Sequence, residues 1–187
     1  MNIKPICGLA AISLLLACQS NLYKIDGFAK ELQDGDTISL SIDEGSAVQQ
    51  LETTVSQGKF LFSGEVDTVR LCRAYVKNNP DCYTTLFIEP GYIAVELSSD
   101  PYLCRVSGTN INNEWQQLAD SINMMMRDIE YLIHTPAPND SAQHMLVHHI
   151  DSLHRKMSDC IIHTGQRNSG NRLGKYIDEN YKAPDFK

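Results

Sequence analysis

The sequence predicts an α+β protein, in which an N-terminal antiparallel β-sandwich is followed by a helical hairpin and a short third helix. Two observations support this fold class. Up to Gly108, short runs of alternating apolar and polar residues are separated by turn residues roughly every 8–12 positions, as in sandwiches. After Gly108, apolar residues recur at the spacing of a helix that buries one face.

About eight short strands are expected in the first part of the chain. The clearest run is 37–42, in which Ile38, Leu40 and Ile42 share one face. Phe60 and Phe62 alternate in the same manner, so we expect both rings in the core. The expected strands are 22–28, 37–42, 47–55, 59–66, 69–76, 82–88, 92–97 and 102–106.

Two long helices and a short one are expected in the remainder. An apolar stripe from Ile111 to Leu132 predicts the first helix, in which Trp115 should anchor the helix to the sandwich. Residues 135–138 end it, and Asp140 is the expected N-cap of the second helix. The short link predicts an antiparallel pair. A third helix is expected over 171–181.

The N-terminus has the pattern of an export signal. One positive charge at Lys4 precedes a mostly apolar run over 6–16, which is too short to span a bilayer as a helix. The run Leu15-Leu16-Ala17-Cys18 resembles the lipobox of bacterial lipoproteins. That resemblance implies a diacylglyceryl group on the Cys18 thiol and cleavage after Ala17.

This pattern divides the chain and predicts its location. The expected segments are a leader over 1–17, a lipidated tether over 18–21, a sandwich over 22–108 and a helical segment over 109–182. Gln19 and Ser20 are not acidic, which favours the outer membrane, with the protein facing the periplasm. The membrane is therefore a predicted partner through the lipid on Cys18.

The charge balance argues against nucleic acid as a partner. The formal net charge of the chain is -7, and no Lys/Arg-rich run appears. No arrangement of side chains indicates a catalytic triad or a phosphate loop, so we expect neither a catalytic residue nor a cofactor.

Four cysteines remain after the leader and the lipid site: Cys72, Cys82, Cys104 and Cys160. Four cysteines allow three pairings, and spacing does not choose among them. A turn is expected at residues 78–81, Asn-Asn-Pro-Asp, because Pro fixes φ and Asn and Asp cap a bend. This turn would leave Cys82 exposed and not directly opposite Cys72. A pairing of Cys72 with Cys104 requires that their strands meet.

Two weaker patterns suggest sites on the surface. His144, His148 and Asp151 fall on one face of the second helix, which is a spacing that can hold a metal, although a solvated polar face explains it better. Asp followed by a hydroxyl residue and an apolar residue recurs along the chain. It resembles the acceptor motif of a bacterial periplasmic O-glycosylation system, with Thr68 and Ser141 as candidate sites.

Three segments together resemble a known family. They are Gly58-Lys59-Phe60-Leu61-Phe62-Ser63-Gly64, Leu86-Phe87-Ile88-Glu89-Pro90-Gly91-Tyr92-Ile93 and Val106-Ser107-Gly108-Thr109-Asn110-Ile111-Asn112. In this order they are similar to the uncharacterised N-terminal domain of lipoprotein thiol:disulfide interchange proteins. The resemblance implies a sandwich and helices that precede a thioredoxin-like domain.

The C-terminal residues resemble the start of that redox domain. Ala183-Pro184-Asp185-Phe186-Lys187 matches its opening, and no C-x-x-C is present, so the redox activity does not carry over. We therefore expect a non-catalytic envelope lipoprotein that acts as an interaction or scaffold module. Two alternatives stay open: a truncated accessory subunit that works with a separate periplasmic thioredoxin-like protein, and a small-ligand-binding protein.

Overall fold

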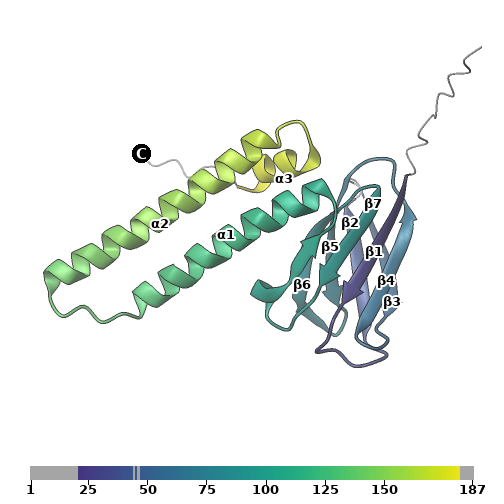
Figure 1. Cartoon of the computed structure of the whole chain (residues 1–187), viewed down its shortest axis with the longest axis horizontal. Helices are drawn as coiled ribbons and strands as arrows, with labels where there is room; N and C mark the ends of the chain where they lie inside the picture. The colour runs from purple at the N-terminus through teal and green to yellow at the C-terminus, as the bar shows by residue number, and fades with distance from the viewer. Residues whose placement is uncertain (1–20, 44, 46, 182–187) are drawn as a thin grey trace, which may run out of the picture.

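The computed structural model describes residues 21–43, 45 and 47–181, and confirms the predicted α+β class (Figure 1). The described residues form two four-stranded sheets followed by three α-helices. Residues 1–20, with the leader and Cys18, and residues 182–187 lie outside the described residues.

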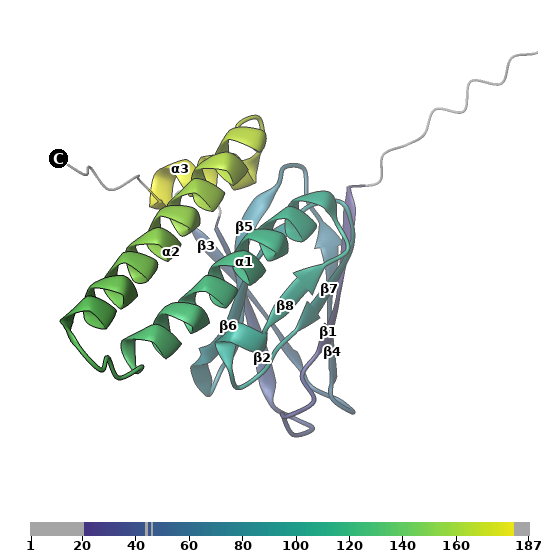
Figure 2. The ribbon, with the colours of Figure 1, turned by 60° about the vertical axis from the view of Figure 1, so that its left-hand side comes forward.

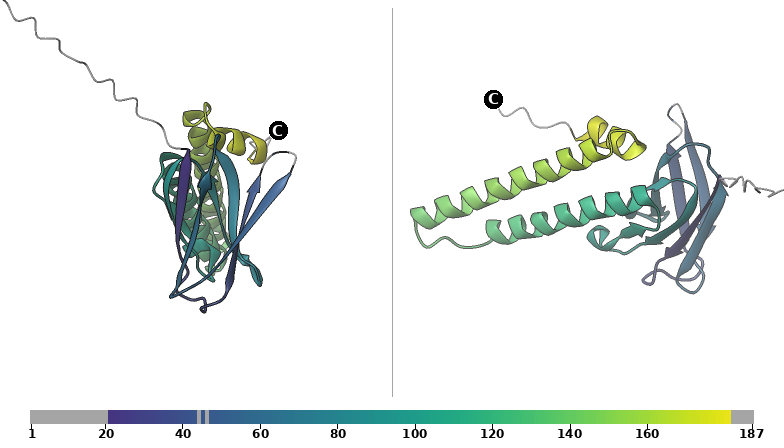
Figure 3. Two further views of the ribbon diagram at one scale, coloured as in Figure 1. Left: turned by 90° about the vertical axis from the view of Figure 1, so that its right-hand side faces the viewer. Right: turned by 45° about the horizontal axis from the view of Figure 1, so that its top comes forward.

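The two sheets pack face to face, and the chain crosses from one sheet to the other four times (Figure 3). The first sheet has the order β4 (Lys59–Glu65), β1 (Leu22–Phe28), β7 (Gly91–Glu96), β8 (Arg105–Ser107). The second has the order β3 (Val48–Thr54), β2 (Thr37–Asp43), β5 (Arg70–Val76), β6 (Asn79–Ile88).

One strand pair departs from the antiparallel prediction. β1 and β7 run parallel at the centre of the first sheet, whereas the other strand pairs are antiparallel. The parallel pair arises because the chain returns from β6 in the opposite sheet and enters β7 beside β1 in the same direction. Alternation of apolar residues cannot reveal this, since it specifies a face and not a direction.

The core between the sheets consists of the inward residues of both. Ile25, Leu40 and Ile93 are fully buried there, and Phe60 and Phe62 lie in the same core. Phe60 is paired across the strands with Gly27, and a Cβ on Gly27 would overlap the Phe60 ring. Glycine is therefore required at this position to make room for the aromatic side chain.

The turn predicted at residues 78–81 was wrong. The turn lies at 77–78, and β6 already begins at Asn79. The register shifts beside Tyr75, so that Pro80 falls within an irregular stretch of β6, the edge strand of its sheet. Proline is tolerated at such a position because no ladder bond from its nitrogen is needed. As a consequence Cys82 is buried, with 2% of its surface exposed, and not exposed as predicted.

The strand predicted over 102–106 is also corrected. A short 3₁₀ turn (η1, Pro101–Leu103) precedes the three-residue β8. Asp100 forms this turn: its Oδ1 accepts from the Tyr102 N–H at 2.9 Å, and its carbonyl accepts from the Leu103 N–H at 3.0 Å. The turn leaves Tyr102 and Leu103 more than half exposed.

The helices are close to the predicted ranges. α1 is Asn110–Ile133, α2 is Asp140–Arg167 and α3 is Arg172–Asn180. The N-cap of α2 is Asn139, whose side chain accepts from the Ala142 N–H at 2.9 Å, and not Asp140. α1 and α2 form an antiparallel hairpin that projects well beyond the sandwich, and α3 lies at its base (Figures 1 and 3).

Two smaller apolar clusters hold the helical part. At the base of the hairpin, Phe87 of β6 is buried with Ile111 and Leu118 of α1 and with Leu173 and Ile177 of α3. Farther out, only Met125, Ile129 and Leu153 are buried between α1 and α2. The distal half of the hairpin therefore has its own small core, separate from that of the sandwich.

Candidate functional site

The start of α1 closes the side of the sandwich where both sheets end (Figure 2). β6 and β8 are the outer strands at this side. Asn112 is fully buried: its Oδ1 accepts from the Phe87 N–H at 2.9 Å, and its Nδ2 donates to the Phe87 carbonyl at 2.7 Å. The asparagine thus completes the hydrogen bonds of β6 as a neighbouring strand would.

Two other side chains of α1 bond to the edge strands β6 and β8, one in each sheet. The Trp115 indole N–H donates to the Thr85 carbonyl of β6 at 3.0 Å. Gln116 serves the other sheet, since its Oε1 accepts from the Val106 N–H of β8 at 2.7 Å. We call these three residues of α1, Asn112, Trp115 and Gln116, the edge clamp.

The ring of Trp115 also joins the helices to the sandwich. It meets Phe87 and Tyr176 edge to face, with ring centroids 6.2 Å and 5.6 Å apart. Burial, and then the neighbouring Tyr181, raise the pKa of Tyr176 to about 12. Tyr176 is therefore a packing residue that stays protonated at neutral pH.

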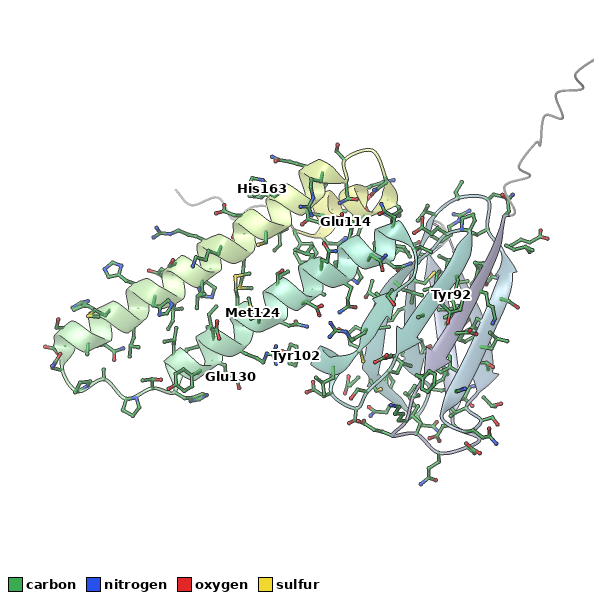
Figure 4. The ribbon with its side chains drawn as sticks, viewed as in Figure 1. Tyr92, Tyr102, Glu114, Met124, Glu130 and His163 are labelled. Carbon is green, nitrogen blue, oxygen red and sulfur yellow. The ribbon has the colours of Figure 1, made fainter. Side chains whose placement is uncertain are left out.

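A groove runs between η1 and the outer half of α1 (Figure 4). Its volume is about 490 Å³, and the buried Ile129 lies among its lining residues. We call this surface the hairpin groove. It is lined by Asp100, Tyr102, Leu103, Met126, Arg127, Ile129, Glu130, Ile133 and His134.

The hairpin groove carries an unusual share of exposed apolar side chains. Ile133 is 63% exposed, Tyr102 58% and Leu103 56%, and Met126 is also exposed. Asp100, Arg127 and Glu130 place charges of both signs among them. An apolar patch with a charged rim is typical of a surface that contacts another molecule.

A second hollow lies on the outer face of the first sheet. Its volume is about 770 Å³, and Phe28, Leu61 and Tyr92 are its exposed apolar residues. The Lys59 amine lies 5.3 Å from the centre of the Phe28 ring, where its charge is attracted to the aromatic face. Both this hollow and the hairpin groove are open to solvent.

The residues singled out for metal binding and glycosylation are exposed. His144, His148 and Asp151 lie on the outer surface of α2, and no group of three or more metal-ligating side chains was found among the described residues. Thr68 is exposed in the loop after β4. Ser141 is exposed in the first turn of α2.

The cysteines of the described residues are free thiols in this structure. Cys72, Cys82 and Cys104 are buried, and Cys160 is half-buried between the helices. Burial raises the pKa of Cys72 to about 12 and that of Cys82 to about 11, and it also raises the pKa of Cys104. Their thiolates are correspondingly scarce at neutral pH.

The sequence analysis missed most of the residues that form the edge clamp and the exposed residues that η1 contributes to the hairpin groove. Tyr102 and Leu103 were assigned to a strand, although Asp100-Pro101 before them is a turn signal. Asn112 lies in one of the three segments that carry the family resemblance. Nothing in the sequence, however, indicated that its side chain bonds to the backbone of β6. Trp115 was expected between helix and sandwich, and its packing against Phe87 lies there.

The fold and the edge clamp define a β-sandwich domain closed by the first turns of a helix. Residues 23–115 match the family described as a domain of unknown function (DUF4369). The expectation of an uncharacterised domain is thereby confirmed. No curated protein matches the chain.

The matched range has a structural meaning. It begins at the second residue of β1 and ends at Trp115, so it contains the sandwich and the first residues of the edge clamp. Most of the hairpin lies beyond it. Separately, no helix among the described residues is both long and apolar enough to cross a membrane.

Proposed function

We propose that this protein is a non-catalytic interaction module of the cell envelope, tethered through a lipid on Cys18, that contacts another protein through the hairpin groove. The observation that carries the proposal is the exposure of four apolar side chains around one groove, Tyr102 and Leu103 from η1 and Met126 and Ile133 from α1 of the projecting hairpin. Contiguous exposed apolar residues of this kind are uncommon on a surface that meets only water.

A protein partner fits this groove better than a small ligand. Small-molecule pockets enclose most of their ligand, whereas the hairpin groove lies open along the helix. Its apolar residues alternate with Asp100, Arg127 and Glu130, an arrangement that gives a protein interface an apolar centre and charged surroundings. This favours the interaction module over the small-ligand alternative.

The environment of the thiols supports a non-catalytic role. Thiol exchange needs an accessible thiolate, and burial acts against one at Cys72, Cys82 and Cys104. We expect the purified protein not to accelerate the reduction of insulin by dithiothreitol. Multiple turnover in that assay, lost in Cys82→Ser, would contradict the proposal and favour a redox role.

The interaction itself is tested by photo-crosslinking. A benzoyl-phenylalanine placed at Ile133 should join the full-length protein to a discrete partner in envelope extracts of the producing organism. The same probe at Tyr92 is the matched control, because Tyr92 is 51% exposed but lies on the outer face of the first sheet (Figure 4).

A second substitution distinguishes a specific contact from random labelling. Leu103→Glu should abolish the crosslink from position 133 without lowering the melting temperature, since Leu103 is 56% exposed. Equal labelling from positions 92 and 133, or labelling that survives Leu103→Glu, would refute the hairpin groove as the contact. Mass spectrometry of the crosslinked partner would tell whether it carries a thioredoxin-like domain.

A further inference from the structure

Two cysteines that are distant in sequence converge on one backbone oxygen. The Cys82 thiol donates to the Ser98 carbonyl at 2.8 Å, and the Cys104 thiol contacts the same oxygen at 3.6 Å. The Ser98 N–H in turn donates to the Cys104 sulfur at 3.3 Å. The two sulfurs can therefore be no farther apart than the sum of their two distances to that oxygen.

The pair lies where the two sheets meet. Cys82 is on β6 of the second sheet, and Cys104 immediately precedes β8 of the first. β6 contacts both β8 and η1, so the backbones on which the two residues sit are neighbours. Both side chains are buried, and the Cys104 sulfur is among the charges that raise the pKa of Cys82 to about 11, after burial itself.

The other cysteines of the described residues are less well placed. Cys72 is paired with Leu86, four residues along β6 from Cys82, a separation of roughly 13 Å at the usual strand rise. Bridged cysteines have Cα atoms within about 7 Å. Cys160 packs between the helices, in the two clusters outside the sandwich core.

We propose that Cys82 and Cys104 form a disulfide that joins the two sheets beside the edge clamp. The step rests on the proposed envelope location, which supplies oxidising conditions. The thiols give up two protons and two electrons as their S–S bond forms. A disulfide of a small molecule or of a thiol oxidase accepts them, and its own S–S bond breaks to yield two thiols.

The sequence offers a direct measurement of this bond. Trypsin releases residues 78–105 as one peptide that contains Cys82 and Cys104 and no other cysteine, and it releases Cys72 within residues 71–73. The purified full-length protein in detergent is incubated with oxidised and reduced glutathione, quenched in acid, alkylated and digested. In the closed pair, peptide 78–105 is lighter than its dithiol form by two hydrogen atoms and carries no alkyl group.

The outcomes separate this pair from the alternatives. Cys72→Ser should leave the closed peptide intact, whereas Cys104→Ser should render Cys82 open to alkylation. The measurement on the unsubstituted protein does not depend on how the variants fold. Alkylation of both residues after oxidation, or a peptide 78–105 linked to 71–73, would refute the proposal.

A second arm separates the bond from the envelope location. Whole cells of the producing organism are quenched in acid and treated in the same way. A closed peptide in purified protein but a dithiol in cells would uphold the pair and contradict export. If peptide 78–105 carried two alkylated cysteines in both preparations, the proposed disulfide between Cys82 and Cys104 would be refuted.

Discussion

Asn112 shows how one polar side chain can decide the stability of a junction. Replacing it by alanine leaves the N–H and carbonyl of Phe87 without their partner in a buried position. Because each unpaired buried group costs about 1–3 kcal/mol, we expect Asn112→Ala to lower the free energy of unfolding by about 2–4 kcal/mol. Urea denaturation measures this. The exposed Gln117→Ala on the same helix should change it by less than about 0.5 kcal/mol, and equal effects would contradict the role of Asn112.

The buried thiol of Cys72 makes stability depend on alkaline pH. Its pKa is raised from 9.0 to about 12, by burial first and also by Asp43, while Arg70 acts in the opposite direction. Above about pH 9 the unfolded chain releases this proton and the folded protein keeps it, so stability falls as pH rises. Under reducing conditions, we expect urea midpoints to decrease between pH 8.5 and 10.5, a range that spans the unfolded pKa of 9.0 and stays below the folded pKa of about 12.

The matched variant isolates the contribution of this residue. Cys72→Ala removes the titrating group, so its midpoint should fall less steeply over the same pH range, whatever its stability at pH 8.5. Cys82, Cys104, Tyr23 and Tyr176, whose pKa values are also raised, contribute to the remaining slope. Identical slopes for Cys72→Ala and the unsubstituted protein would show that folding does not raise the pKa of the Cys72 thiol.

At the scale of single elements, the two halves of the hairpin differ in the contacts that hold them in place. The base of α1 is clamped to β6 and β8, whereas the outer half is held by Met125, Ile129 and Leu153. We expect amide hydrogens around these three residues to exchange faster than those near Ile111 and Leu118. Leu153→Ala should accelerate exchange only in the outer hairpin, because it leaves a cavity in that small cluster.

Hydrogen exchange with mass spectrometry distinguishes this from a global effect. Leu40→Ala, which opens a cavity in the sandwich core, serves as the comparison and should accelerate exchange in the strands. If Leu153→Ala accelerated exchange in β2 and β5 as much as in α2, the hairpin and sandwich would be a single cooperative unit.

The strands that sequence predicted well are those with strict alternation. Ile38, Leu40 and Ile42 identify β2 because a strand with one buried face must alternate. Pro80 misled the prediction of β6, because an edge strand accepts a proline that a central strand would reject. Because of that error, the sequence analysis predicted Cys82 to be exposed. The proximity of Cys82 to Cys104 depends on a contact between the two sheets, which no local sequence pattern encodes.

The edge clamp was beyond sequence reasoning for a related reason. Asn112 and Gln116 look like polar residues of an amphipathic helix, whose usual place is in solvent. Their partners are backbone groups of β6 and β8, and backbone groups leave no trace in the sequence. The apolar stripe of α1, by contrast, placed the helix on the sandwich correctly.

At the scale of the whole molecule, the positions of β1 and the hairpin suit a tethered module. β1 begins on the side of the sandwich away from the hairpin (Figure 1). Under the proposed lipid anchor on Cys18, the chain would enter the sandwich on the side opposite to the hairpin. The groove would then be accessible to a partner in the periplasm.

The anchor is tested by removing the thiol that would carry it. Cys18→Ser should release the protein from membranes or leave it as an uncleaved precursor, because no other lipid site is proposed. Membrane fractionation and mass spectrometry of the mature N-terminus measure both. Cys160→Ser is the control and should stay in the membrane fraction. A Cys18→Ser protein that is processed and remains membrane-bound would refute the lipid anchor.

The edge clamp also has a consequence for how the protein is made. The last bonds of β6 come from α1, which follows it in the chain, so every new copy passes through a stage in which β6 and β8 are unpaired on one side. Unpaired strands readily recruit strands from other chains. Docking of α1 ends this stage, and the helix thereby protects newly made copies from polymerising through their sheets.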